Sequence, residues 1–254
     1  GEGITGEALN IVIGSAPDKE AEKDKVKYNI LKILNEKYGI TEEDFLSAEL
    51  EAVPALKAKD VGFDRSMIGA YGDDRVCAYA ELRAILECAA PEKTAICILA
   101  DKEEIGSEGV SGMQSQAFES FVSELCKIQG ADMYRCFENS FCISADVLNA
   151  FDPTYPEVSE KRNNAKINYG LGVCKFTGAR GKSGSNDASA EVIGKIRRMF
   201  KEDGVVWQLG ELGKVDQGGG GTIAKFMANR NIDTIDAGVP VLSMHAPYEL
   251  VSKL

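Results

Sequence analysis

The pattern of apolar and polar positions is most informative between residues 94 and 104. Residues 94–100 form an almost unbroken apolar run, and charged residues that include Glu103 and Glu104 follow it directly. A run of this length bounded by charge predicts a strand that is buried on both faces. In open α/β sheets, ligands bind beyond the carboxyl ends of the strands, so the two glutamates are candidates for chemistry. The alternative is that they simply begin a solvated loop.

Beyond residue 62 the chain alternates between helical and strand patterns. Apolar residues at helical spacing predict helices over residues 76–86, 118–128 and 192–200, with a further short helix over 222–227. Apolar segments predict strands over residues 140–145, 205–209 and 239–244. This alternation indicates an α/β fold with a largely parallel or mixed sheet.

The first 62 residues have a different pattern. Apolar positions predict a helix over residues 26–34, and Thr41 with Asp44 forms a capping-box pattern that begins a second, short helix. Residues 48–52 alternate between apolar and polar, which predicts a strand with one wet face. We therefore expect residues 1–62 to form a separate or accessory layer.

Composition and charge narrow the classes of partner. The chain has 254 residues, of which 40 are acidic and 29 basic, for a formal net charge of −11. This charge argues against a nucleic-acid backbone or an anionic membrane surface as the partner. The sequence shows neither a membrane-spanning apolar run nor a signal-peptide pattern, so we expect a cytoplasmic protein. The seven cysteines include no Cys-x-x-Cys pair and are expected to be free thiols, not zinc ligands.

Acidic side chains and the single histidine fall at junctions between the predicted elements. These residues are Asp73, Glu103, Glu104, Asp146 and His245. If the strands are parallel neighbours, the side chains converge at one edge of the sheet, where carboxylates and an imidazole suit divalent zinc, manganese or cobalt. Carboxylates that lie close together repel one another unless a cation neutralises them. A glutamate next to a liganding glutamate can also act as general base on a metal-activated water.

Taken alone, His245 would be an ordinary core or surface histidine. Its position after a predicted buried strand, in a loop that ends at Pro247, favours a ligand instead.

A tract of four glycines at residues 218–221 precedes a predicted helix and could approach a phosphate group closely. Neither nucleotide motif fits. Phe176 stands where a P-loop ending in residues 181–183 needs glycine, and Ile223 stands where a dinucleotide fingerprint needs one. A phosphate-binding module is therefore the third hypothesis for the chain, and a purely structural turn is the alternative for the tract.

Six segments of the chain resemble the aspartyl aminopeptidase family of dinuclear metalloaminopeptidases, most closely its bacterial branch. In chain order they are Tyr71-Gly72-Asp73-Asp74-Arg75, residues 101–107, residues 144–147, residues 207–216, residues 218–222 and Ser243-Met244-His245-Ala246-Pro247. The resemblance implies a zinc-peptidase-like α/β fold with a mixed, largely parallel sheet flanked by helices. It implies a catalytic domain over residues 63–254, preceded over residues 1–62 by the remainder of an inserted, β-rich dimerisation domain.

The resemblance also implies a cytosolic enzyme that hydrolyses N-terminal residues from peptides and that commonly assembles as a homo-oligomer, a dodecamer. Each active site of the family holds two divalent ions, which we expect to be zinc, with cobalt or manganese as alternatives. Asp73 matches the ligand that bridges the two ions. Glu104 and His245 match the other ligands of one ion, and Asp146 matches a ligand of the second.

Glu103 matches the general base of the family, and Asp74 matches a supporting residue, with the order of the two adjacent aspartates left open. The family also binds metal through a histidine in an N-terminal His-x-Asp segment, and this chain has no such residue. We therefore expect a fragment, with residues 248–254 as the start of a helix. Two functions compete: a metalloaminopeptidase, and a catalytically silent assembly or binding module. The residues that bind substrate are not assigned; three lysines could bind an acidic side chain of a substrate: Lys175, Lys182 and Lys214.

Overall fold

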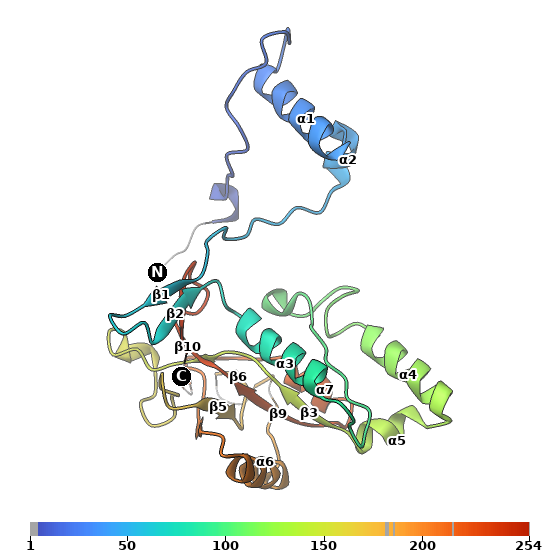
Figure 1. Ribbon diagram of the computed structural model, residues 1–254, viewed down its shortest axis with the longest axis vertical. Coiled ribbons are helices and arrows are strands. Elements are labelled where there is room, and N and C mark those ends of the chain that lie inside the picture. Colours follow the sequence, from blue (N-terminus) through green and yellow to red (C-terminus); the bar gives the residue numbers. More distant parts are fainter. Residues whose placement is uncertain (1–4, 181–182, 185, 215, 254) are drawn as a thin grey trace. The chain divides into compact units, whose positions relative to one another are not determined.

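The computed structural model describes residues 5–180, 183–184, 186–214 and 216–253 (Figure 1). The chain divides into two compact units, one up to Val53 and one from Pro54 onward. The domain boundary at residue 62 and the dimerisation role of the first part stay predictions. Among the described residues, no helix combines the length and the hydropathy that crossing a bilayer requires.

The first unit contains η1 (Gly6–Ala8), α1 (Lys25–Tyr38) and α2 (Glu42–Ser47). At the end of α1, Gly39 has a φ of 71°, a left-handed conformation that glycine adopts without strain. Thr41 and Asp44 form the predicted capping box at the start of α2. The strand predicted over residues 48–52 is wrong. These residues are exposed and belong to no strand, because alternation alone does not supply a neighbouring strand to bond with.

Two mixed sheets form the framework of the second unit. One has the order β1-β2-β11-β10-β4, with bounds Lys59–Val61, Met67–Ala70, Glu249–Ser252, Pro240–Leu242 and Leu148–Asn149. The other has the order β3-β9-β5-β7, with bounds Phe141–Ser144, Asp233–Gly238, Leu171–Cys174 and Trp207–Leu209. Both sheets contain parallel pairs (β3 with β9, β5 with β7, β10 with β4) together with antiparallel ones. A small ladder joins β6 (Gly178–Ala179) to β8 (Gly219–Gly220).

Helices flank the two sheets, as the sequence predicted. They are α3 (Arg75–Glu87), α4 (Ala117–Gln129), α5 (Met133–Glu138), α6 (Ala190–Asp203) and α7 (Ala224–Ala228), with the short turns η2 (Glu103–Ile105) and η3 (Pro156–Val158). In α6, Ile196 and Phe200 pack with Val173 of β5 and Ile235 of β9 in one core cluster. Residues of α4, α5 and α7 form a second cluster. The α/β class with a mixed, helix-flanked sheet is therefore confirmed.

Two further elements differ from their predictions. None of residues 94–100 belongs to a strand, and the only pairing nearby is an isolated bridge between Asp101 and Gly112. Leu99 is 57% exposed, so the apolar run lacks the two-sided cover that was expected. The helix predicted over residues 248–254 is also wrong. Residues 249–252 form β11, which pairs with both β2 and β10.

Candidate metal centre

Three of the predicted ligands lie together in the second unit. Asp73 lies between β2 and α3, Glu104 belongs to η2, and His245 follows β10. The imidazole Nε2 of His245 lies 3.1 Å from Asp73 Oδ2 and 3.3 Å from Glu104 Oε2. One potential ligand atom from each residue lies within 4.8 Å of the others, so the three could hold one cation.

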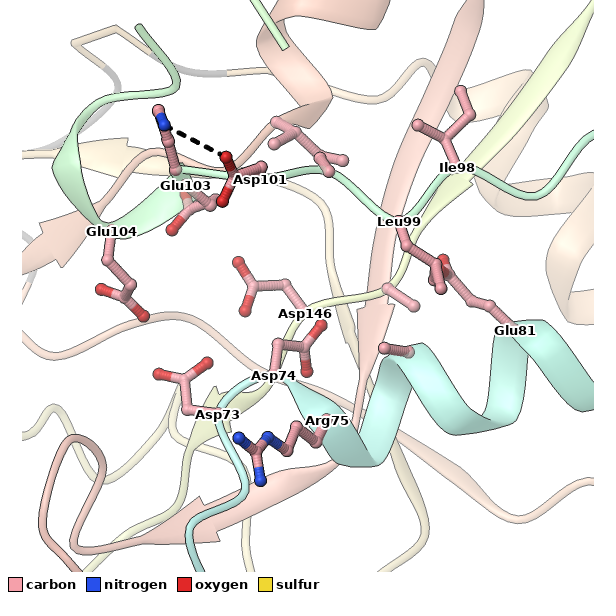
Figure 2. A pocket seen from close by; sticks show the side chains of 15 residues that line it. Asp73, Asp74, Arg75, Glu81, Ile98, Leu99, Asp101, Glu103, Glu104 and Asp146 are labelled. Carbon is pink, nitrogen blue, oxygen red and sulfur yellow. Dashed lines mark ion pairs between the residues drawn. The ribbon is translucent and has the colours of Figure 1, made fainter. Parts of the chain in front are cut away.

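A second group shares a member with the first. Ligand oxygens of Asp73, Asp74 and Asp146 also lie within 4.8 Å of one another. Figure 2 shows the carboxylates of Asp73, Asp74 and Asp146 with those of Glu103 and Glu104 around a common space. The structure thus brings together the six residues that the sequence singled out, although their separate roles stay predictions. Asp73 occupies the position from which one carboxylate could contact two ions.

The carboxylates of this site interact unfavourably without a cation. Burial raises the pKa of Asp146 to about 8, and the neighbouring Asp74 and Glu103 add to the effect. Burial likewise raises the pKa of Asp74 to about 6. The pKa of Asp73 rises for the same reason and because Glu104 lies beside it. Since nearby negative charges favour protonation, a divalent ion would compensate the charge that these acids carry when ionised. The donor set of carboxylates and one imidazole fits zinc.

Glu103 faces the same space as the ligand groups without belonging to either of them among the described residues. Its carboxyl is half-buried, and burial, followed by the charge of Glu104, raises its pKa above the usual value. A carboxylate with a raised pKa is a better proton acceptor near neutral pH. The role of Glu103 as general base stays a prediction, and its raised pKa is compatible with that role.

The glycine tract lines the cavity of this site. Gly219, Gly220, Gly221 and Thr222 border a cavity of about 400 Å³ together with Asp73, Glu104, Asp146 and His245. The glycine at position 219 has a structural cause, because its φ is 91° and a Cβ there would lie 2.1 Å from the carbonyl oxygen of Gly178. The hydroxyl of Thr222 donates to Asp236 Oδ1 at 2.6 Å. The tract therefore forms a close-packed wall of the cavity.

Of the three lysines considered for substrate binding, the structure describes two, Lys175 and Lys214. Lys175 pairs with Asp187 at 2.5 Å. Lys214 is half-buried, and Lys182 lies outside the described residues. The cation that would bind an acidic substrate side chain therefore stays unassigned.

Glu249 was missed by the sequence analysis. It is 1% exposed, and its carboxylate accepts backbone hydrogen bonds from Asp73 and His245. The sequence of residues 249–252 (Glu-Leu-Val-Ser) has no apolar–polar alternation, and a helix was predicted there, so no local signal pointed to Glu249.

In this α/β unit, acidic side chains and a single imidazole surround one cavity. The chain therefore belongs to the class of proteins with a candidate divalent-metal centre. The particular family follows from comparison with known proteins. The family described as Aminopeptidase I zinc metalloprotease (M18) matches residues 4–254, and the chain belongs to this family.

Relatives support the assignment over nearly the whole chain. A probable M18 family aminopeptidase 1 from Clostridium acetobutylicum is 55% identical, and the alignment covers 98% of this chain and 55% of that protein. One from Thermotoga maritima is 50% identical, with 99% and 57% covered. The crystal structure of an M18 aminopeptidase from Thermotoga maritima matches with a TM-score of 0.89 at 51% identity, covering 94% of this chain and 54% of the other. The chain thus spans about half the length of the relatives it matches.

Proposed function

We propose that this protein is a zinc-dependent aminopeptidase that hydrolyses N-terminal residues from peptides. The observation that carries the proposal is the pair of candidate ligand groups that share Asp73. In this proposal Glu104 and His245 complete one site with Asp73, and Asp146 contributes to the second, with Asp74 supporting it. Membership of a zinc metalloprotease family supports zinc over cobalt or manganese. The number of two ions per active site is inferred from the resemblance to the family.

The reaction needs a water nucleophile, a polarised carbonyl and a proton path. Bound zinc would supply the polarisation of the scissile carbonyl and lower the pKa of the attacking water. The carboxylate of Glu103 accepts the proton of that water as its oxygen bonds to the carbonyl carbon. The same carboxyl then gives the proton to the leaving amine nitrogen as the carbon–nitrogen bond breaks. The cavity walls formed by residues 219–222 limit the space in which the peptide can lie.

The test is substitution of the proposed base. Glu103→Gln keeps the size of the side chain but cannot accept the proton, so hydrolysis of aminoacyl-p-nitroanilides should fall by about 100-fold or more while zinc content stays unchanged. Glu108→Gln is the matched control, because Glu108 is an exposed carboxylate a few residues away in the same loop. Full activity of Glu103→Gln would contradict the assigned role.

A second candidate function is a catalytically silent assembly or binding module. It is favoured by one observation: the chain has a single histidine, and that residue belongs to the first ligand group, which leaves the second group with carboxylates only. Zinc or cobalt titration of the chain separates the two candidates. Turnover in the presence of either metal excludes the silent module, and metal binding without turnover excludes the peptidase for this chain.

We further propose that the protein is a cytoplasmic homo-oligomer. All seven cysteines are free, as is usual in a reducing compartment. Apolar side chains in the first unit are strongly exposed, including Val12 at 89% and Ile11 and Ile13 at 66% each, which favours burial against another copy. Multi-angle light scattering tests this, and a monomer at micromolar concentration would contradict it. The number of subunits and the preferred N-terminal residue are not assigned.

A further inference from the structure

Glu249 connects the two segments that carry the candidate ligands Asp73 and His245. Its side chain lies at the start of β11, the strand between β2 and β10, and is 1% exposed. Glu249 Oε2 accepts hydrogen bonds from the backbone N–H groups of Gly72 and Asp73, at 2.7 and 2.5 Å. Glu249 Oε1 accepts one from the backbone N–H of His245 at 2.7 Å. One carboxylate therefore fixes two backbones that are far apart in sequence.

The backbone around His245 has an uncommon conformation that these hydrogen bonds stabilise. His245 has a φ of 66°, a left-handed conformation that is uncommon for residues other than glycine, and Ser243 nearby has a φ of 58°. Hydrogen bonds from N–H groups to a charged acceptor are stronger than those between neutral groups, so the carboxylate can hold this turn. Gly72 allows the approach, because a Cβ at that position would lie only 3.2 Å from Glu249 Oε2.

We propose that Glu249 is a positioning residue that sets the distance between Asp73 and His245 before a metal binds. This inference rests on the proposed metal centre. Both oxygens of Glu249 already accept backbone hydrogen bonds, and Glu249 belongs to neither ligand group found among the described residues. In this proposal Glu249 affects metal binding through the positions of the ligands and does not itself bind the metal. Hydrogen bonds that surround a metal site without reaching the metal orient its ligands and tune the affinity for the metal.

The experiment compares Glu249→Gln with Val251→Ala in the 254-residue chain. Glutamine keeps the volume but places an NH₂ group against backbone donors. Val251 is buried in the same strand, packs in a core cluster with Val147 and Val241, and belongs to neither ligand group, so its truncation reports the loss of core packing. Zinc affinity is measured by competition with a chelator, the ligand geometry by the visible absorption of bound Co²⁺, and folding by thermal unfolding.

We expect Glu249→Gln to weaken zinc binding by about 10- to 100-fold and to change the Co²⁺ spectrum, while Val251→Ala lowers the unfolding temperature without changing either. Equal affinity and an identical spectrum in folded Glu249→Gln would overturn the positioning role. If that variant does not fold, Gly72→Ala takes its place, since the added Cβ would lie 3.2 Å from Glu249 Oε2 and push the carboxylate by a few tenths of an ångström. It should weaken zinc binding in the same direction, and unchanged affinity would overturn the proposal.

Failure of the proposed function gives a different result. A wild-type chain that binds zinc without hydrolysing peptides contradicts the peptidase, while the affinities of the variants still decide the role of Glu249. A wild-type chain that binds no zinc overturns both proposals. A wild-type chain that binds zinc and hydrolyses peptides, beside an unaffected Glu249→Gln, overturns the positioning role alone.

Discussion

At the scale of single residues, Asp73 is the side chain on which the site depends most. Its carboxylate is 7% exposed, belongs to both candidate ligand groups, and has its backbone N–H fixed by Glu249. His245 and Asp146 each belong to only one of the groups. Variants of the three residues should therefore differ in which ion they bind less tightly.

This difference is testable by substitution and metal titration. Asp73→Asn should weaken binding at both sites, whereas His245→Ala should weaken only the first and Asp146→Asn only the second. Isothermal titration calorimetry with Zn²⁺ gives the stoichiometry and the affinity. Asp101→Asn is the control, since Asp101 lines the same region but bonds Ser111 and pairs with Lys102. Loss of a single site in Asp73→Asn would contradict the shared position.

Glu81, which belongs to neither candidate ligand group, allows a prediction about pH. It is a half-buried residue of α3, and burial raises the pKa of its carboxyl from 4.5 to about 7. A raised pKa means that the folded protein binds the proton more tightly than the unfolded chain. The stability of the native chain therefore declines as pH rises from about 4.5 through 7, and a glutamine at this position removes that decline.

Relative to the native chain, Glu81→Gln should gain about 1 kcal/mol of unfolding free energy between pH 5 and pH 8. One pKa unit corresponds to about 1.4 kcal/mol, and the partial exposure of Glu81 reduces the effect. Urea unfolding of both proteins at pH 5, 6, 7 and 8 measures it, and the pH dependence of other groups cancels in the difference. A constant difference over this range would show that the carboxyl has its ordinary pKa.

The residues of the site were predictable because each signal is local. An acidic residue or a histidine shortly after an apolar segment is visible in one stretch of sequence. Asp73, Asp146 and His245 each follow a strand, whereas Glu104 follows an apolar run that forms no strand. Glu249 was not predictable in the same way. Its partners are the backbone N–H groups of residues 176 and 177 positions away, and only the folded sheet brings them together.

At the scale of elements, helices were predicted better than strands. The periodicity of apolar residues placed α3, α4 and α6 within a few residues of their bounds, because helical hydrogen bonds lie within the segment. A strand needs a partner from elsewhere, and the apolar run at residues 94–100 shows the consequence. Among the described residues, this run has no neighbouring strand to bond with. Its own sequence does not show whether such a strand is present.

The packing of α6 gives a prediction at this scale. Ile196 is 1% exposed and lies in the cluster between α6 and the β3-β9-β5-β7 sheet. Ile196→Ala should lower the free energy of unfolding by about 2–5 kcal/mol, because the cavity it leaves adds to the lost burial. Ile128→Ala in α4 is the matched control, since Ile128 is 82% exposed. Equal losses in urea unfolding would contradict the assigned core.

At the scale of the whole molecule, the mixed topology was only partly predictable. The alternation of elements indicated an α/β fold, but the antiparallel pairing of β5 with β9 and of β11 with β2 joins segments far apart in the chain. The pairing of β11 with β2 and with β10 brings the three strands side by side, and the candidate ligands Asp73 and His245 follow the ends of β2 and β10. Long-range pairing thus determines the site as much as the identity of its residues does.

Metal binding should consequently stabilise the whole second unit in a way that depends on pH. In the metal-free chain the raised pKa values of Asp146, about 8, and Asp74, about 6, mean that stability falls as pH rises and these acids ionise. Zinc needs the ionised carboxylates and competes with protons for them, so its affinity rises over the same range. At a fixed concentration of free zinc, the rise in affinity increases the difference in stability between the zinc-bound and metal-free chains.

The shift in unfolding temperature on adding zinc should therefore be larger at pH 8 than at pH 5.5. At a free zinc concentration about 100 times the dissociation constant, the stabilisation should reach about 2.7 kcal/mol. Removal of zinc with a chelator should reverse it, and the double variant Asp73→Asn/Asp146→Asn should show almost none at either pH. A zinc-induced shift that is equal at pH 5.5 and pH 8 would mean that these buried carboxylates do not hold the ion, because their protonation would then not compete with its binding.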